Sequence, residues 1–164
     1  MKIQIVNDKD EIIGIKDRGN ILDRDIYRVS ALWITNSKGQ ILLAKRSLNK
    51  KNDPGLWGPA VAGTVEEYES YEANIIKEAR EEIGVGSYTF NLGPKMRVTS
   101  PHNHFTQWFT LVIDKPLESF NIQKEEVDKI QWFDKDELLD EMQDNPDKFI
   151  KSLVRDREIF FNLS

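Results

Sequence analysis

The chain has 164 residues, of which 23 are Lys or Arg and 28 are Asp or Glu, so its formal net charge is −5. With 39% hydrophobic and 31% charged residues it has the composition of one ordinary folded domain, and disorder and a membrane-embedded fold are excluded. The lack of cysteine excludes disulfides, thiolate metal sites and cysteine nucleophiles. The longest uncharged run, residues 98–113, is interrupted by Pro101 and several polar residues, so we expect no membrane span. The first residues lack the pattern of a secretion signal, and we expect a cytoplasmic location.

Two hairpins and a loop are predicted in the first part of the chain. The four strands are Ile3–Val6, Glu11–Lys16, Tyr27–Thr35 and Gln40–Lys45. The first pair forms an N-terminal hairpin extension over residues 1–26, and the second pair flanks a polar turn that ends at Gly39. Asn, Gly and Pro residues in the segment Ser47–Gly58 predict a loop.

The second part of the chain alternates between helical and strand patterns. A helix is predicted over Ser70–Ile83, which contains neither Gly nor Pro, and Gly84 is placed to end it. The later predicted elements are strands at Tyr88–Thr99, Phe105–Ile113 and Val127–Phe133 and helices at Glu137–Met142 and Asp147–Phe161. This order predicts the α/β fold class, with residues 1–164 as a single domain whose mixed sheet is covered by helices.

Negative charge is concentrated in residues 63–85. This segment holds seven Glu against one Lys and one Arg, so its net charge of −5 equals that of the whole chain. On the predicted helix, Glu78, Glu81 and Glu82 share one face, opposite an apolar stripe. Carboxylates three and four residues apart repel each other unless a cation lies between them. The face is therefore either solvated, with Lys77 and Glu81 as an ion pair, or a site for a hard divalent cation.

The spacing of this segment resembles the signature of the Nudix hydrolases, G-x5-E-x7-R-E-U-x-E-E-x-G-U, in which U is an aliphatic residue. Six fixed positions match, at Gly63, Glu69, Glu78, Glu81, Glu82 and Gly84. Two positions depart from it. Lys77 stands where the family has Arg and lacks the planar fork that orients a carboxylate, so altered activity is expected. Ala79 occupies an aliphatic position with less volume.

The resemblance implies a Nudix-type α/β/α sandwich and hydrolysis of a diphosphate that is linked to another chemical group. It implies that Mg²⁺, or alternatively Mn²⁺, is held by Glu78, Glu81, Glu82 and the main-chain carbonyl of Gly63. Glu69 would support this site, and Lys77 would orient or neutralise Glu78. The water's proton would go to Glu81 or Glu82, or to a base just before the last predicted strand. There Glu125 and Glu126 are the candidates, with Glu126 preferred, although a solvated loop is an equally good interpretation of both.

The similarity extends upstream of this signature segment, residues 63–85, which we call the Nudix box. The runs 40–46, 54–58 and 62–63 resemble the Nudix branch that includes isopentenyl diphosphate isomerases and isomerase-like hydrolases. The isomerases use an active-site cysteine and a histidine-rich metal site. This chain has no cysteine, and its only histidines are His102 and His104, so hydrolysis is expected and isomerisation is the less favoured alternative.

Four side chains outside the box are candidates for binding substrate. Lys45 and Arg46 belong to a basic cluster with Lys50 and Lys51, which would receive phosphates or simply be solvated. Trp57 would stack on a substrate ring, although core packing is the favoured interpretation. His104, in a turn with His102, would bind substrate or act as a base, with a structural role as the alternative.

Two functions of different classes follow from these residues. The first is a Mg²⁺-dependent hydrolase of a nucleoside diphosphate derivative or related organic diphosphate. The second is a Nudix module that binds a nucleotide or a protein without hydrolysis; the four retained box carboxylates favour the first. A pI of about 5.2 and the lack of a basic stripe argue against nucleic-acid binding. The expected partner is a small-molecule diphosphate, with a homodimer possible through the N-terminal hairpin.

Overall fold

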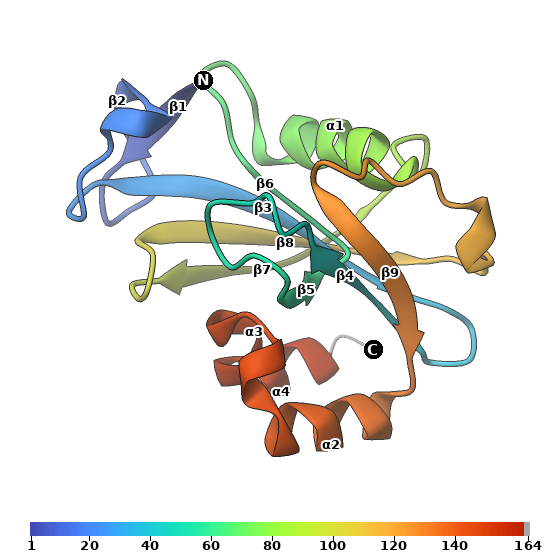
Figure 1. Ribbon diagram of the computed structural model, residues 1–164. Helices are drawn as coiled ribbons and strands as arrows, with labels where there is room; N and C mark the ends of the chain where they lie inside the picture. The colour runs from blue at the N-terminus through green and yellow to red at the C-terminus, as the bar shows by residue number, and fades with distance from the viewer. Residues whose placement is uncertain (163–164) are drawn as a thin grey trace.

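A mixed β-sheet forms the middle layer of the structure, a computed structural model that describes residues 1–162 (Figure 1). Within these residues the sheet has nine strands. They are β1 (Lys2–Val6), β2 (Ile12–Asp17), β3 (Ile26–Thr35), β4 (Ile41–Arg46), β5 (Trp57–Pro59), β6 (Val61–Thr64), β7 (Asn91–Val98), β8 (His104–Val112) and β9 (Val127–Phe133).

Helices cover both faces of this sheet. Figure 1 shows α1 on one face and α2, α3 and α4 together on the other, which is the three-layered α/β/α arrangement predicted for this chain. The helices are α1 (Tyr71–Ile83), α2 (Lys135–Asp144), α3 (Lys151–Arg155) and α4 (Arg157–Phe161), with short 3-10 turns η1 (Arg18–Asn20), η2 (Leu117–Ser119) and η3 (Pro146–Lys148). No helix between residues 1 and 162 combines the length and the apolarity needed to cross a membrane.

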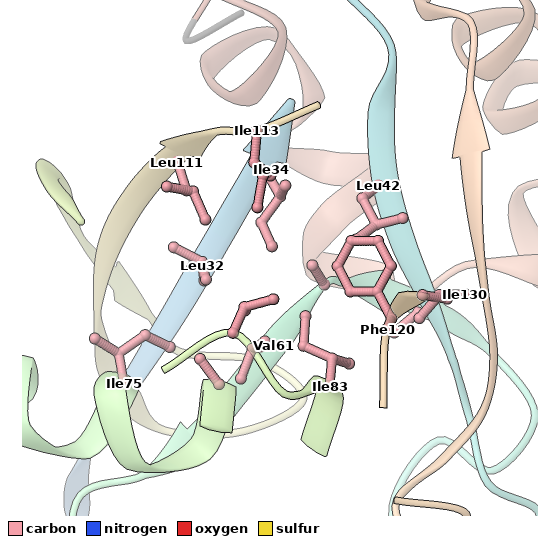
Figure 2. Packing of buried hydrophobic residues seen from close by; sticks show 14 of the residues in the cluster. Leu32, Ile34, Leu42, Val61, Ile75, Ile83, Leu111, Ile113, Phe120 and Ile130 are labelled. Carbon is pink, nitrogen blue, oxygen red and sulfur yellow. The ribbon is translucent and has the colours of Figure 1, made fainter. Parts of the chain in front are cut away.

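Strand β3 organises the sheet. It pairs antiparallel with β1, β4 and β6 and parallel with β8. Because side chains alternate along a strand, Leu32 and Ile34 enter the core beneath α1, while Trp33 enters the core beneath α2–α4. Figure 2 shows the first core, in which Ile75 and Ile83 of α1 lie over these strands. Each such buried aliphatic side chain contributes roughly 1.5–3 kcal/mol to folding.

The structure corrects two parts of the predicted chain order. The predicted loop Ser47–Gly58 runs into β5, and the short β6 follows it; both strands exist because β4 and β3 supply pairing partners that local sequence does not reveal. The single helix predicted over Asp147–Phe161 is wrong. The chain is extended at Ile150 and leaves the helical region at Asp156, so η3, α3 and α4 replace it. These breaks let Phe149, Leu153 and Phe160 reach one core.

The N-terminal hairpin is part of the main sheet and holds the loop that precedes α1. The side chain of Gln4 is 2% exposed, and its amide nitrogen donates to the carbonyls of Glu66 (2.9 Å), Glu67 (3.2 Å) and Glu69 (2.8 Å). Its carbonyl oxygen accepts a hydrogen bond from Arg28 at 2.9 Å. Strand β1 therefore fixes the backbone of residues 66–69 from a distance of more than 60 residues along the chain.

A partly buried ion-pair network fixes the turn between β1 and β2. Asp10 lies 2.7 Å from the Nε of Arg28 and 2.5 Å from the Nζ of Lys95, and it accepts a hydrogen bond from Tyr71 at 3.0 Å. Burial alone would raise the pKa of Asp10, but these hydrogen bonds outweigh it and hold the pKa below its usual range. The hairpin turn is thereby joined to β3, α1 and β7.

His104 is the first residue of β8 and packs against Tyr27 of the neighbouring strand β3. Its ring lies 5.2 Å from that of Tyr27, and its Nδ1 lies 3.0 Å from the hydroxyl of Thr106. Burial, followed by the charges of His102 and Arg97, lowers the pKa of His104 to about 4. The folded state therefore holds His104 neutral in a pH range where the unfolded chain protonates it.

Replacing Gln4 by Met should destabilise the fold, because Met matches the length of Gln and cannot donate to the three buried carbonyls. We expect the free energy of unfolding to fall by roughly 2–3 kcal/mol, measured by urea denaturation. Gln143→Met, on the exposed face of α2, is the matched control and should change stability by less than about 0.5 kcal/mol. Equal losses in the two variants would contradict the contribution of the Gln4 amide.

The low pKa of His104 predicts a pH-dependent loss of stability. Its contribution is fully present above the unfolded pKa of about 6.5 and is lost as the pH falls toward about 4, because only the unfolded chain binds the proton. The free energy of unfolding of His104→Gln, relative to that of wild type, should therefore rise by on the order of 1–2 kcal/mol when the pH is lowered from about 7 to about 4.5. Urea denaturation at the two pH values measures this difference. His102→Gln serves as the control. A difference between wild type and His104→Gln that does not change with pH would contradict this prediction.

Candidate active site

Helix α1 carries the acidic segment and is capped at both ends. The hydroxyl of Ser70 accepts a hydrogen bond from the backbone N–H of Ala73, and Gly84 ends the helix in the left-handed region at φ 76°. Ile75, Ala79 and Ile83 are fully buried against the sheet. Burial of this stripe sets the rotation of α1 about its axis and therefore determines where its carboxylates lie.

β6 and α1 approach each other closely at Gly63 and Glu78. A Cβ atom built on Gly63 would lie 2.4 Å from Cγ and 3.0 Å from Oε1 of Glu78, so only glycine fits there. Burial raises the pKa of the Glu78 carboxyl, Lys77 lowers it, and the neighbouring Glu81 and Glu69 carboxylates raise it further, with a net increase. The structure thus brings together two predicted ligand positions, the carbonyl-bearing Gly63 and Glu78.

Asn74 connects this contact to its surroundings. Its side chain is fully buried, bonds to the hydroxyl of Ser30, and donates to the carbonyl of Thr64 at 3.1 Å and to Glu69 at 2.8 Å. Sequence reasoning missed Asn74 and Ser30. A polar residue one turn before Glu78, next to the buried Ile75, was the available signal.

Lys77 lies among three carboxylates. Its ammonium is 2.6 Å from Glu66, 2.6 Å from Glu69 and 3.6 Å from Glu78. Burial favours the neutral amine, but the hydrogen bonds to Glu66 and Glu69 outweigh it and raise the pKa of Lys77 above its usual value. Burial alone would raise the pKa of Glu69. Hydrogen bonds from Lys77, from the backbone N–H of Glu66 and from Asn74 outweigh burial and lower the pKa. Lys77 was predicted to orient or neutralise Glu78. In the structure its shorter contacts are with Glu69 and Glu66, and sequence reasoning missed Glu66.

Glu82 faces a cavity of about 90 Å³ on the side of α1 nearest β4 and β9. It is 8% exposed, and burial, followed by the charges of Glu78 and Glu126, raises its pKa to about 8. Arg46, Lys50 and Glu126 line the same cavity, and Lys50 forms an ion pair with Glu126. Two cations and two carboxylates therefore meet at one hollow.

Backbone hydrogen bonds hold Glu126 in this position. The N–H of Gln123 donates to the carbonyl of Glu82 at 2.9 Å, and the N–H of Ser47 donates to the carbonyl of Glu126 at 3.0 Å. These bonds fasten the segment before β9 to the end of α1 and to the loop after β4. Glu125 is exposed and does not line the cavity.

The remaining predicted residues lie elsewhere. Glu81 is exposed on α1, and Lys45, the neighbour of Arg46 on β4, does not line the Glu82 cavity. Trp57 packs edge to face on Phe133 at 5.1 Å, the packing role that the sequence favoured. His104 lines neither this cavity nor the larger cleft near the N-terminal hairpin.

The acidic side chains are not gathered into a preformed metal cage. Among residues 1–162, no group of three or more His, Cys, Asp or Glu side chains is arranged to hold a metal ion. Glu78 rests on Gly63 beside Lys77, whereas Glu82 faces Arg46 and Lys50. The carboxyl groups of Glu78 and Glu82 nevertheless share one helix, and both have raised pKa values because burial disfavours their charged forms and neighbouring carboxylates add to the effect.

Solved structures of other proteins share this fold. DR0079 from Deinococcus radiodurans superposes with a TM-score of 0.80 at 24% identity, over 94% of this chain and 98% of that one. The NUDIX domain of Shewanella oneidensis NrtR, solved in complex with ADP ribose, has a TM-score of 0.58 at 18% identity, over 78% of this chain and 82% of that one. These similarities confirm the predicted fold class.

Sequence comparison identifies the family. Isopentenyl-diphosphate Delta-isomerase of Citrobacter koseri is 32% identical over 119 residues, which are 67% of this chain and 63% of that protein. The chain spans 45–47% of the length of other isomerases that it matches. The family model described as NUDIX domain matches residues 26–153, which include the whole segment from Gly63 to Val85. The resemblance expected from the box is confirmed, and the chain belongs to the NUDIX domain family.

Proposed function

We propose that this protein hydrolyses a diphosphate bond in a nucleoside diphosphate derivative or a related organic diphosphate, with the help of a divalent cation. The observation that carries the proposal is the hollow at Glu82, where a buried carboxyl group with a raised pKa lies beside Arg46 and Lys50. Two carboxylates, Glu82 and Glu126, line this hollow together with Arg46 and Lys50. Carboxylates suit a divalent cation and basic side chains suit phosphate oxygens, so the arrangement supports a site for a metal-bound diphosphate.

The residues present fit a hard divalent cation. Burial and the neighbouring carboxylates raise the pKa values of Glu78 and Glu82, and a cation bound there would offset this cost. The missing side chain of Gly63 leaves room for Glu78 against the strand. Glu78, Glu81, Glu82 and the carbonyl of Gly63 would hold Mg²⁺, or Mn²⁺ in its place. When bound, such an ion supplies charge neutralisation at the phosphate and acidifies a water molecule.

The protein's own groups would bind the diphosphate and accept the proton. Arg46 offers a planar guanidinium to phosphate oxygens, and Lys50 offers an ammonium that is held by Glu126 before substrate arrives. A phosphate that takes over Lys50 leaves the Glu126 carboxylate free, and Glu126 then removes the proton from the attacking water. Lys77 keeps Glu69 and Glu66 in place and offsets part of the negative charge near Glu78.

Two other functions are less well supported. The curated relatives are isomerases, but this chain lacks cysteine, and neither His102 nor His104 lines the Glu82 cavity. A non-catalytic binding module is favoured by one observation, since the NrtR domain of the same fold was solved with ADP ribose. Retention of all four box carboxylates makes hydrolysis the better account of this chain.

A screen of nucleoside and organic diphosphates with Mg²⁺ or Mn²⁺, read by phosphate release, tests the proposed activity directly. We expect release from at least one substrate and none in EDTA. Tight binding of one compound, with no release from any, would contradict hydrolysis and establish the binding module.

The box carboxylates provide the first mutational test. Glu78→Gln, Glu81→Gln and Glu82→Gln should each reduce turnover by roughly 100-fold or more. Loss of a residue that only supports a metal ligand typically lowers activity by about 10- to 100-fold, and loss of the ligand itself should lower it further. Steady-state phosphate release with the active substrate measures the effect. Glu118→Gln, at an exposed site in η2, is the control. Unchanged turnover in all three box variants would exclude the mechanism.

Gly63 provides the second test. In Gly63→Ala the new methyl group would overlap the Glu78 side chain, so the carboxyl must move. We expect Mn²⁺ affinity, measured by calorimetry, and turnover each to fall by roughly tenfold or more. Gly14→Ala is the matched control, since its Cβ would meet nothing within 4 Å. If both variants bind Mn²⁺ like wild type, the placement of Glu78 does not matter to the site.

A further inference from the structure

The outer strand of the N-terminal hairpin is an open edge of the sheet. Within residues 1–162, β2 pairs with β1 and with no other strand. Figure 1 shows the hairpin at one end of the molecule, away from α2–α4. Proteins usually protect such an edge with charged side chains, proline or a covering element, because its free N–H and C=O groups can pair with another chain. The hydrolase activity proposed above does not use this edge.

Two hydrogen bonds of the hairpin show which backbone groups of β2 are free. The N–H of Asn7 donates to the carbonyl of Glu11 at 3.0 Å, and the N–H of Arg18 donates to the first carbonyl of the chain at 2.9 Å. Residues that bond to the partner strand alternate with residues that do not along an antiparallel ladder. The backbone groups of Ile12, next to Glu11, and of Ile15, three residues before Arg18, therefore point away from β1.

Two isoleucine side chains lie together on one face of this edge. Ile12 is opposite Val6, and Ile15 is opposite Gln4. Because those two partners are two residues apart in β1, they and the isoleucines opposite them share one face. The isoleucines are 54% and 38% exposed, and Ile13, the extra residue at the bulge, is 66% exposed. The free edge is therefore apolar, although edge strands in contact with water are usually charged.

Two charged side chains lie on the other face of the same strand. Glu11 is opposite Asn7 and Lys16 is opposite Ile3, and these partners point to the side away from the isoleucines. Glu11 is exposed, and the half-buried Lys16 contacts Asp25 at 2.6 Å. An ammonium group has three donors, so Lys16 can bind a second carboxylate.

We propose that two copies of this chain associate through antiparallel pairing of β2 with β2, around a two-fold axis normal to the sheet. Ile12 of one copy lies opposite Ile15 of the other, where both strands have free backbone groups, so each such pair exchanges two hydrogen bonds. The axis keeps each face of the sheet on its own side. The four isoleucines therefore meet on one face, and Glu11 meets Lys16 of the second copy on the other.

Self-complementarity is the reason for choosing a second copy over a foreign strand. One register satisfies the free backbone groups, the apolar side chains and the charges of β2 together, whereas parallel pairing would place like charges side by side. The proposal does not depend on the hydrolase function, and the oligomeric state decides it.

Sedimentation velocity over a range of protein concentrations tests the association. An interface of one strand and its flanking turns is small, so we expect a dimer with a Kd on the order of 10–100 µM. Ile15→Lys places a charge on the apolar face and should raise this Kd roughly tenfold or more. Val112→Lys is the matched control, since Val112 is 65% exposed in β8, which lies between β3 and β7. A wild-type chain that stays monomeric, or equal Kd values for wild type and Ile15→Lys, would overturn the proposal.

A charge exchange tests the register. Glu11→Lys alone and Lys16→Glu alone each bring like charges together across the two-fold axis, so each variant should dimerise more weakly than wild type. In a one-to-one mixture of the two variants, unlike charges face each other at both ends of β2. The mixture should form a heterodimer with a Kd within about threefold of the wild-type value. If the mixture associates no better than either variant alone, the register is wrong.

Hydrogen exchange locates the interface independently of any substitution. The amides of Ile12 and Ile15 are free in the monomer, so their exchange should slow as the protein concentration is raised through the Kd. Strand β9, which pairs with β4 alone among the strands of residues 1–162, is the control edge and should not change. A dimer whose protected amides lie outside β2 would contradict the assignment of this edge.

Discussion

The contact between α1 and β6 is the constraint on which the rest of the site depends. The helix comes so close to the strand that Glu78 occupies the space of a missing Gly63 side chain. At that distance the buried amide of Asn74 must find partners, and it finds them on β3, on β6 and in the box loop. One fully satisfied polar group thus fixes the height of the helix above the sheet, and the positions of the box carboxylates follow from it.

The site balances charges at two places along one face of α1. Lys77 lies among Glu66, Glu69 and Glu78. Glu82, one helical turn after Glu78, lines the hollow with Arg46 and Lys50. A compact ammonium can contact several carboxylates from different directions, whereas a planar guanidinium favours one bidentate partner. The departure from the family's Arg at position 77 therefore accompanies a three-way contact, in which Glu66 takes part.

Local patterns sufficed to predict most elements but few of the contacts between them. The capping residues and apolar stripe of α1 are encoded within about 15 residues, and the runs of β-branched, aliphatic and aromatic residues that predict β1 to β4 are equally local. The strands β5 and β6 are too short to have a pattern of their own and exist through pairing with β4 and β3. The contact of Lys77 with Glu66, the burial of Glu82 and the break at Asp156 likewise depend on neighbours that are distant in sequence. The spacing of the box predicts the site residues, and only the fold shows how the charges of these residues are distributed.

The attachment of Gln4 to the box loop also has a consequence for how the protein folds. Its three hydrogen bonds join residues separated by 62 to 65 positions, and such closures are entropically costly and form late. The family match begins at residue 26, after both strands of the hairpin. A strand outside the family match therefore holds the loop that leads into the box helix. Order in the loop that leads to Glu69 and α1 is expected to arrive only when the first strand has docked.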